Sequence, residues 1–300
     1  MENLTSKFSA ARTIPWSRPQ GCPSQFETQQ VFTGNDDGDL ALEVGVAKWG
    51  GAEAPSREAF LKLHKDRAGQ GINPVVVLAI AGEKAWLFGP NSQAAVIGPL
   101  AIDHVQRLLQ SALNEPSGLD ARRSLNQTYE AISATSTGGS EADALRGVGN
   151  AGLFATHELR HGVRNRSDWK DACLKSKELM ALRKDELVKK LGYSLEDVGG
   201  HASLLKSNGA NPRAVAVMLL DNETFDGQSN RFAVSPVAFG LQIAERREVS
   251  WLIVLRKDAI RLYPARLDLG VGRKGLAETY FELNLSVADE STAGFHSLVF

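Results

Sequence analysis

The chain has 300 residues, of which 43% are hydrophobic and 23% charged, and its formal net charge at pH 7 is −1. This composition fits one large or two modest globular domains, and a charge so near zero indicates no partner by itself. Cys22 and Cys173 are too few for a disulfide framework or a cysteine zinc site. The apolar runs are shorter than the roughly 20 residues that span a membrane, and the N-terminus lacks a signal-peptide core. We therefore expect a cytoplasmic protein with no membrane partner.

The first part of the sequence reads as an arm followed by an α/β unit. Residues 1–38 are rich in Ser, Thr, Gln, Pro and Gly, which predicts a poorly ordered arm. Residues 39–133 form the first unit, which begins with the strand LALEVGVAKWGG. A helix capped by Ser56 and a hairpin over 74–90 follow. Two more helices are predicted at AIDHVQRLLQSALNEP and GLDARRSLNQTYEAISA.

A small, polar linker over 134–149 leads to the second unit, 150–300. Ser167 is the predicted N-cap of one long helix over 168–193. The elements expected after it are a short helix (SLEDVGGHASLLKSNG), a strand (RAVAVMLLDNE), a helix (SPVAFGLQIAERRE), a hairpin over 249–265 and a strand or mixed segment (GLAETYFELNLS). The chain ends on the apolar run STAGFHSLVF. This run is either a terminal core strand or an indication that the intact protein continues beyond residue 300, and we expect the second.

Two segments correspond to one another without a gap. At a constant offset of 175 residues, the segment PVVVLAIAGEKAWLFGP (74–90) aligns with VSWLIVLRKDAIRLYPA (249–265). Each segment follows an amphipathic helix. The few identities fit two ordinary hairpins, and the pattern also fits a duplicated α/β unit. Both interpretations stay open.

The segment His157-Glu158-Leu159-Arg160-His161 matches the HExxH motif of zinc metalloprotease helices. Such a site needs a third ligand, and no HxxGxxH extension follows. Arg160 would place a cation beside the metal, and Gly162 would end the helix early. The sequence therefore favours a structural segment, and a zinc peptidase is the weakest of the alternatives.

Positive charge is concentrated between residues 145 and 190, where eleven Lys and Arg stand against six Asp and Glu. Such a cluster either contacts phosphates or forms a solvated helix face. The part HGVRNR precedes a helix N-terminus and is the best candidate for phosphate contact. The glycine-rich GVGRKG is a basic turn with a second candidate contact. The candidate DNA-binding residues are Arg160, Arg164, Arg166, Lys170, Arg273 and Lys274.

Two carboxylates, Asp221 and Glu223, follow the predicted strand AVAVMLL. Carboxylates at a strand end are common magnesium ligands in nucleases, and residues two apart on a strand share a face. The lysine that a metal nuclease places two residues after an acid is replaced by Phe225. Carboxylates that cap a turn are the alternative, and we name no metal site in the chain.

Four segments of the second half resemble the N-terminal region of type IIG-like restriction–modification and phage-defence adenine DNA methylases of bacteria. They are GVGNAGLFATHELRHGVRNRSDW, LLKSNGANPRAVAVMLL, SPVAFGLQIAERREVSWLIVLRKDAIRLYPA and GVGRKGLAETYFELNLS. The hallmark of that region is a helix with Gln, then a strand, a turn and a strand that closes in LY, a pattern filled here by Gln242, residues 251–255 and 261–263. The similarity covers roughly 145–290 and, more loosely, 40–130.

The resemblance implies α/β units of mixed sheet flanked by helices, of a restriction-endonuclease-like fold that has lost part of its catalytic set. It makes Gln242 a further catalytic candidate beside Asp221 and Glu223. The acid-x-Lys of the family is replaced by Asp221-Asn222-Glu223-Thr224-Phe225, and NPPY-type and glycine-rich methyl-donor motifs are absent from the 300 residues. S-adenosylmethionine would therefore bind only in a downstream domain.

The expected function is a DNA-engaging or scaffold module of such a methyltransferase, inactive alone, with DNA and other defence-system proteins as partners. The alternative is an active magnesium-dependent DNA nuclease, which would make magnesium the cofactor of this chain.

Overall fold

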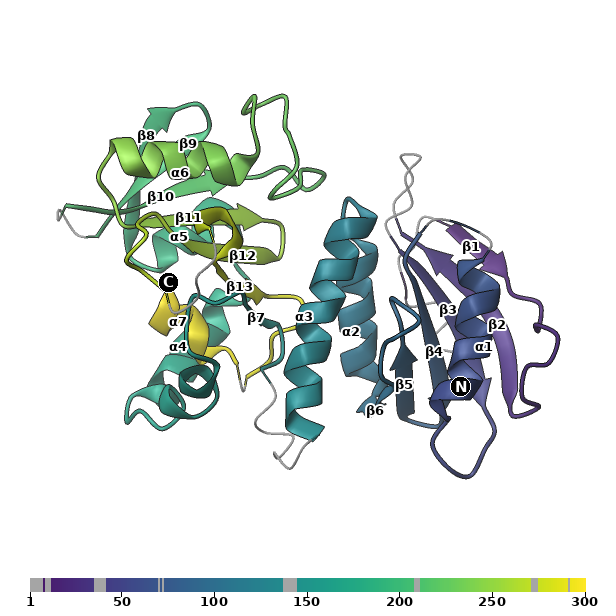
Figure 1. The fold of residues 1–300 in the computed structure, drawn as a ribbon. Coiled ribbons are helices and arrows are strands. Elements are labelled where there is room, and N and C mark those ends of the chain that lie inside the picture. The colour runs from purple at the N-terminus through teal and green to yellow at the C-terminus, as the bar shows by residue number, and fades with distance from the viewer. Residues whose placement is uncertain are drawn as a thin grey trace. The chain divides into compact units, whose positions relative to one another are not determined.

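A computed structural model shows an α/β protein with two mixed sheets flanked by helices (Figure 1). It divides into two compact units, Met1–Ser133 and Ala134–Phe300. The structure describes residues 8, 12–34, 42–69, 71, 73–136, 145–207, 211–270, 275–290 and 292–300. No helix in those ranges is both long and apolar enough to cross a membrane.

The first unit is built on a six-stranded sheet in which the strands follow chain order. Its strands are β1 (Arg12–Pro15), β2 (Phe26–Thr33), β3 (Glu43–Trp49), β4 (Val75–Ala81), β5 (Lys84–Phe88) and β6 (Ile97–Ala101). Only β3 and β4 pair in parallel, because the helix α1 (Arg57–Ala68) crosses between them. The expected poorly ordered arm is wrong for residues 12–15 and 26–33, which form β1 and β2 of the sheet.

Helices cover both faces of this sheet. Phe60 and Leu63 of α1 are buried among Val75, Val77 and Phe88 on one face. The helices α2 (Ile102–Leu113) and α3 (Gly118–Ser136) contribute to the core of the other face. The predicted cap is confirmed, because the Ser56 hydroxyl accepts a hydrogen bond from the Ala59 amide at 3.2 Å.

The second unit is built on a seven-stranded sheet of order β7-β13-β12-β11-β10-β9-β8. Its strands are β7 (Val148–Asn150), β8 (Tyr193–Gly199), β9 (Ala202–Ser207), β10 (Pro212–Met218), β11 (Trp251–Arg256), β12 (Ala259–Pro264) and β13 (Phe281–Asn284). Its helical elements are the π-turn η2 (Glu158–Gly162), α4 (Trp169–Leu179), α5 (Lys184–Lys190), α6 (Pro236–Arg246), the 3-10 turn η3 (Leu276–Glu278) and α7 (Gly294–Val299). Only β10 and β11 pair in parallel, joined by α6.

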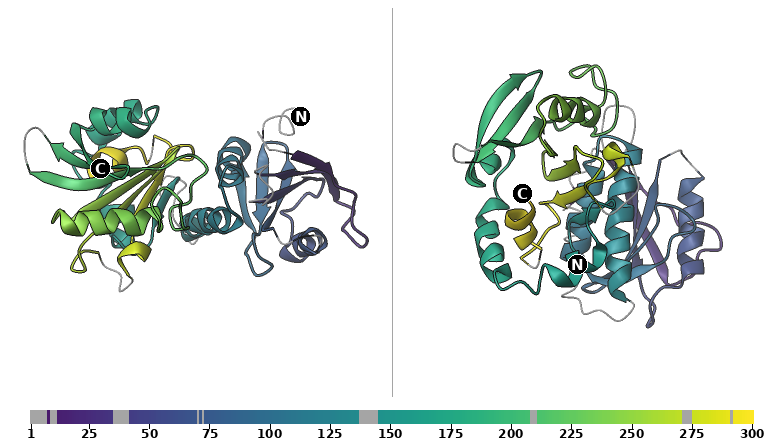
Figure 2. Two further views of the ribbon diagram at one scale, coloured as in Figure 1. Left: turned by 90° about the horizontal axis from the view of Figure 1, so that it is seen from above. Right: turned by 60° about the vertical axis from the view of Figure 1, so that its left-hand side comes forward.

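Alternate side chains of the central strands β10 and β11 point to opposite faces of the sheet and contribute to two separate cores. Val217 and Val254 face Val237 of α6, whereas Leu255 lies on the opposite face near Val188 of α5. Figure 2 shows helices on both sides of the sheet. The sheet is therefore buried on both faces in its centre, as expected for strands as apolar as these.

Two predicted helices of this unit differ from the structure. The helix expected over 168–193 is two helices, because Arg183 is extended and Lys184 has a φ of 49°. Ser167 is not its cap, since Asp168 holds the N-cap position without a side-chain hydrogen bond. The short helix expected at SLEDVGGHASLLKSNG is the antiparallel pair β8–β9, whose turn contains Gly199 and Gly200 with positive φ. A glycine turn between two short apolar runs favours a hairpin.

The two sheets share six strands of the same topology. In each unit, three antiparallel strands lead through one helix to a parallel neighbour, which begins two further antiparallel pairings. The hairpins also share their register at the offset of 175, with Val77–Phe88 against Leu252–Tyr263 and Ala79–Trp86 against Val254–Arg261. The correspondence seen in the sequence therefore extends to the pairing of the strands.

Candidate functional site

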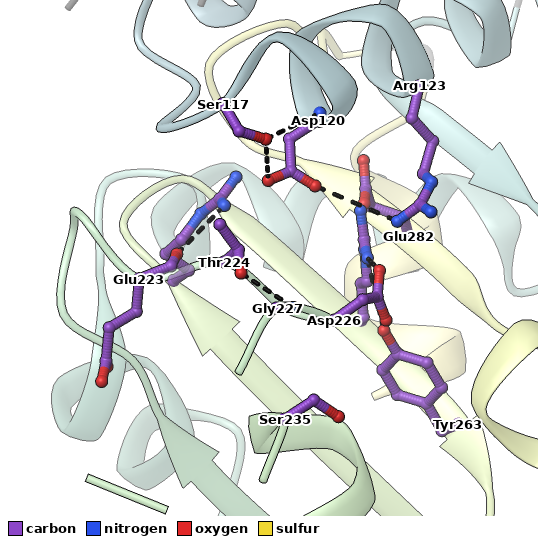
Figure 3. A network of polar contacts seen from close by, with 12 residues as sticks. Ser117, Asp120, Arg123, Glu223, Thr224, Asp226, Gly227, Ser235, Tyr263 and Glu282 are labelled. Carbon is purple, nitrogen blue, oxygen red and sulfur yellow. Dashed lines mark hydrogen bonds and ion pairs between the residues drawn. The ribbon is translucent and has the colours of Figure 1, made fainter. Parts of the chain in front are cut away.

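The segment 219–235 connects β10 to α6 and is anchored by one carboxylate. The Glu223 side chain accepts hydrogen bonds from the Leu220 amide at 2.8 Å and the Ser229 hydroxyl at 3.0 Å, and it pairs with Arg231. Thr224, next to it in Figure 3, accepts a hydrogen bond from the Gly227 amide at 2.8 Å. Loops of this length are usually functional or disordered, and these bonds hold this one in place.

Beside this loop lies a buried guanidinium. The Arg261 side chain is 5% exposed and forms ion pairs with Glu282 and, at 3.5 Å, with Asp226. Its guanidinium carbon is 3.8 Å from the ring centre of Phe225 and 4.5 Å from that of Tyr280. Asp226 and Glu282 are labelled in Figure 3. Two rings and two carboxylates therefore surround one cation that has been removed from water.

Charge and burial shift the pKa of Arg261 in opposite directions. Burial alone would lower the pKa of Arg261, but the facing carboxylate of Glu282 keeps that pKa well above its ordinary value. Burial raises the pKa of Tyr263, whose hydroxyl accepts a hydrogen bond from Arg261 at 3.4 Å. Both side chains therefore keep one protonation state over the whole physiological range. Such groups hold a structure in place and do not exchange protons with a substrate.

Arg256 joins the loop to this cluster. Its guanidinium donates to the Glu223 carbonyl at 3.2 Å and lies 4.6 Å from the ring centre of Phe225. Phe225 replaces the lysine that the metal-nuclease pattern requires. In the structure it is fully buried and contacts two arginines. Phe225 thus has a packing role.

The three candidate catalytic residues have different surroundings. Glu223 is engaged by three donors, whereas Asp221 is exposed and lies 3.3 Å from the Lys184 ammonium. Both follow the last strand residue, Met218, so strand alternation does not align them as predicted. Gln242 is exposed, two residues from the buried positions Gly240 and Ala244 of α6. Within the described ranges, no group of three or more His, Cys, Asp or Glu is placed to hold a metal.

The HELRH segment forms the π-turn η2. The Val163 amide donates to the Glu158 carbonyl at 2.8 Å, the spacing of five residues that defines a π-turn. His157 and His161 are exposed, with ring centres 4.9 Å apart. Two neighbouring imidazoles supply only two of the ligands that a catalytic zinc needs.

The candidate DNA-binding residues begin in this turn and extend into α4. Arg160 and Arg164 are half-buried, whereas Arg166 and Lys170 are exposed. Arg166 donates two hydrogen bonds to Asp168, at 2.8 and 2.7 Å. These bonds raise the pKa of Arg166 and lower that of Asp168. Arg273 and Lys274 lie outside the described residues.

Acids from other parts of the chain offset much of the positive charge of residues 145–190. Four of its eleven cations pair with acids outside 145–190, in the pairs Arg146–Asp289 (3.0 Å), Lys177–Glu290 (2.7 Å), Arg183–Asp258 (2.8 Å) and Lys184–Asp221 (3.3 Å). These pairs offset most of the excess of five. The positive charge that remains is concentrated in residues 160–170, where Asp168 is the single acid.

The same segment borders a cavity of about 620 Å³ on the sheet face opposite α6. Its floor includes Trp251 and Ile253 of β11, and its walls include Tyr193 of β8. Arg166 and Arg213, both exposed, are its two cations. Sequence reasoning missed this cavity, because its lining residues come from segments that are far apart in the chain.

Comparisons of the chain with protein-family models, with curated proteins and with solved structures gave no match. Function is therefore inferred from the residues of the chain and their arrangement.

Proposed function

We propose that the second unit engages DNA as a module of a bacterial restriction–modification or phage-defence DNA methyltransferase, and that it contributes shape and charge and no chemistry. The observation that carries the proposal is the segment 160–170, with four cations, one acid and an adjoining cavity that holds Arg213. Cations gathered in this way neutralise phosphates and release counterions. The family resemblance and the mixed sheet flanked by helices support the same function.

The hydrogen bonds and the ion pair of the Glu223 carboxylate support a module without catalysis. A nuclease metal needs carboxylate oxygens that are free to leave their donors. Glu223 already binds Leu220, Ser229 and Arg231. Removing it for a metal would release the loop that it anchors. The restriction-endonuclease-like fold, in this proposal, is kept as a scaffold.

Binding of a fluorescent duplex at low salt, measured by anisotropy, tests this function. We expect weak binding without sequence preference, with an affinity that falls with salt by a slope of about 0.9 per phosphate contact. Arg164→Gln combined with Lys170→Gln should weaken binding and flatten that slope. No binding of the native protein at low salt, or an unchanged slope in the variant, would contradict the proposal.

A matched control exists on the same unit. Arg266 binds Asp268 through two hydrogen bonds at 3.0 and 2.8 Å, the same arrangement as Arg166 with Asp168. Arg266 does not line the cavity. We therefore expect Arg166→Gln to weaken DNA binding and Arg266→Gln to leave it unchanged.

A magnesium-dependent nuclease is the second candidate, and one contact favours it. Lys184 supplies beside Asp221 the lysine that the sequence does not show nearby. Incubation of plasmid DNA with the protein and magnesium or manganese separates the two functions. Our proposal expects no cleavage. Cleavage that is lost in Asp221→Asn and in Lys184→Gln, with both variants shown to be folded by circular dichroism, would establish the nuclease.

A further inference from the structure

We propose that the cavity of the second unit binds one unpaired nucleotide, with the base among its aromatic side chains and the phosphate at Arg213. This inference rests on the proposed function, since it names the part of the nucleic acid that the module holds. Figure 2 shows the helices that flank this sheet on both sides.

The first argument is the lining. Phe154, Tyr193, Trp251 and Phe300 contribute aromatic side chains to a cavity of about 620 Å³. This volume is in the usual range for small-molecule sites. Aromatic side chains bind bases by stacking, which needs a base that has left its duplex. A concave aromatic site therefore favours an unpaired nucleotide over paired DNA.

The second argument is the conformation of β10 at Arg213. The pairing with β9 passes from Pro212–Lys206 to Ala214–Leu205, so Arg213 is the additional residue of a β-bulge. Regular alternation would place Arg213 on the face opposite Ala214, yet both residues line the cavity. Bulges redirect side chains in this way next to functional sites. The bulge thus places a cation at a mainly aromatic and aliphatic cavity.

The third argument is charge. Arg213 has no ion-pair partner among the residues that the structure describes, whereas Arg166 pairs with Asp168. Arg213 is therefore free to bind a phosphate in a charge-assisted hydrogen bond. Glu158 is the carboxylate of the lining. A carboxylate there can accept a hydrogen bond from the amino group of a base such as adenine.

Titration with 5′-deoxyadenosine monophosphate tests the site through tryptophan fluorescence. Trp251 lines the cavity, so the nucleotide should quench part of the emission of the five tryptophans. Trp251→Phe should abolish this quenching, and Trp49→Phe should preserve it, because Trp49 lies in the first unit. Inorganic phosphate alone should compete only weakly, since it makes no stacking contact.

Calorimetry then measures the affinity of each variant. We expect Arg213→Gln to weaken nucleotide binding by roughly tenfold, the usual effect of losing a charge-assisted hydrogen bond. Arg266→Gln is the control and should bind as the native protein does. An unchanged affinity in Arg213→Gln, or quenching that persists in Trp251→Phe, would overturn the site.

The outcome can be separated from that of the proposed function. Duplex binding without any nucleotide binding removes the cavity site and keeps the DNA-engaging module. Nucleotide binding without duplex binding keeps the site and removes the module. Circular dichroism of each variant establishes that it is folded, which we expect for Arg213→Gln because the side chain is exposed.

Discussion

The guanidinium carbon of Arg261 lies 3.8 Å from the ring centre of Phe225, in the core of the second unit. A buried cation is stable only when its partners compensate the loss of water. Here Glu282 supplies the opposite charge, and Tyr280 covers the guanidinium at 4.5 Å.

Arg261→Met should lower the free energy of unfolding by about 3–5 kcal/mol, because it leaves the Glu282 carboxylate buried without its cation. Arg261→Lys should not restore stability, since an ammonium cannot stack between two rings as a planar guanidinium does. Urea denaturation followed by circular dichroism measures both. The double variant Arg261→Met, Glu282→Leu should recover much of the loss. A double variant as unstable as Arg261→Met would refute this account.

The turns of the two related hairpins predict a pair of opposite effects. Lys257 has a φ of 43° at the position that Gly82, with a φ of 60°, occupies in the first unit. A side chain in the left-handed region costs about 1–2 kcal/mol, partly offset by the greater freedom of glycine in the unfolded chain.

Lys257→Gly should therefore stabilise the protein by up to about 1 kcal/mol, and Gly82→Lys should destabilise it by a similar amount. No atom lies within 4 Å of a Cβ built at Gly82, so backbone conformation alone is tested. Thermal unfolding of both variants is the measurement. The prediction fails if the two substitutions change stability in the same direction.

His296 makes stability depend on pH. Burial, followed by the positive charge of Arg183, lowers its pKa to about 4. Between pH 6.5 and 4 the unfolded chain binds a proton that the folded chain excludes, so stability falls as the pH falls. The full shift corresponds to about 3 kcal/mol.

Denaturation curves at pH 7 and pH 4.5 measure this loss. His296→Leu should reduce the difference between the two pH values. It should not remove the difference, because burial also lowers the pKa of His64 in the first unit. An equal pH dependence in the native protein and the variant would show that His296 contributes nothing.

Gly240 lets α6 approach the sheet. A Cβ there would lie 2.5 Å from Leu252 Cδ1 and 3.1 Å from Val217 Cγ2. Since Leu252 is fully buried, it has little room to move. Gly240→Ala should cost about 1–3 kcal/mol despite the better helix propensity of alanine. Leu252→Val should rescue part of that loss in urea denaturation, whereas additive losses would show that the two sites do not touch.

Local patterns predicted most of the elements. The helix capped by Ser56 and the hairpins over 74–90 and 249–265 follow from apolar periodicity and short turns, which act within a few residues. The β8–β9 pair was missed because its apolar residues fit both periods, and only pairing with β10 selects the strand. The end of α4 and the start of α5 at Arg183 could not be predicted, because no glycine or proline lies near that position in the sequence.

The site was less predictable because its contacts are long-range. Glu282 lies 21 residues from Arg261 in the sequence, and the Asp221–Lys184 pair spans 37 residues. The charged residues of RLYP and FELN, Arg261 and Glu282, did indicate buried ion pairs, because charged side chains inside apolar strands are usually paired. Their partner could not be named without the register of β12 and β13. The bulge at Arg213 depends on the pairing with β9 and leaves no mark in the sequence.

The shared strand order has a consequence for how quickly each unit folds. Each hairpin closes over a two-residue turn, whereas the parallel pairs join residues 32 and 37 positions apart, Glu43 with Val75 and Ala214 with Trp251. Closing chains of these two lengths differs in entropy by about 0.1 kcal/mol. The pairing of β7 with β13 lies outside these six shared strands and joins Val148 with Leu283, 135 positions apart. Closing it costs about 1 kcal/mol more in entropy than closing either parallel pair, so the second unit should complete its sheet more slowly than the first.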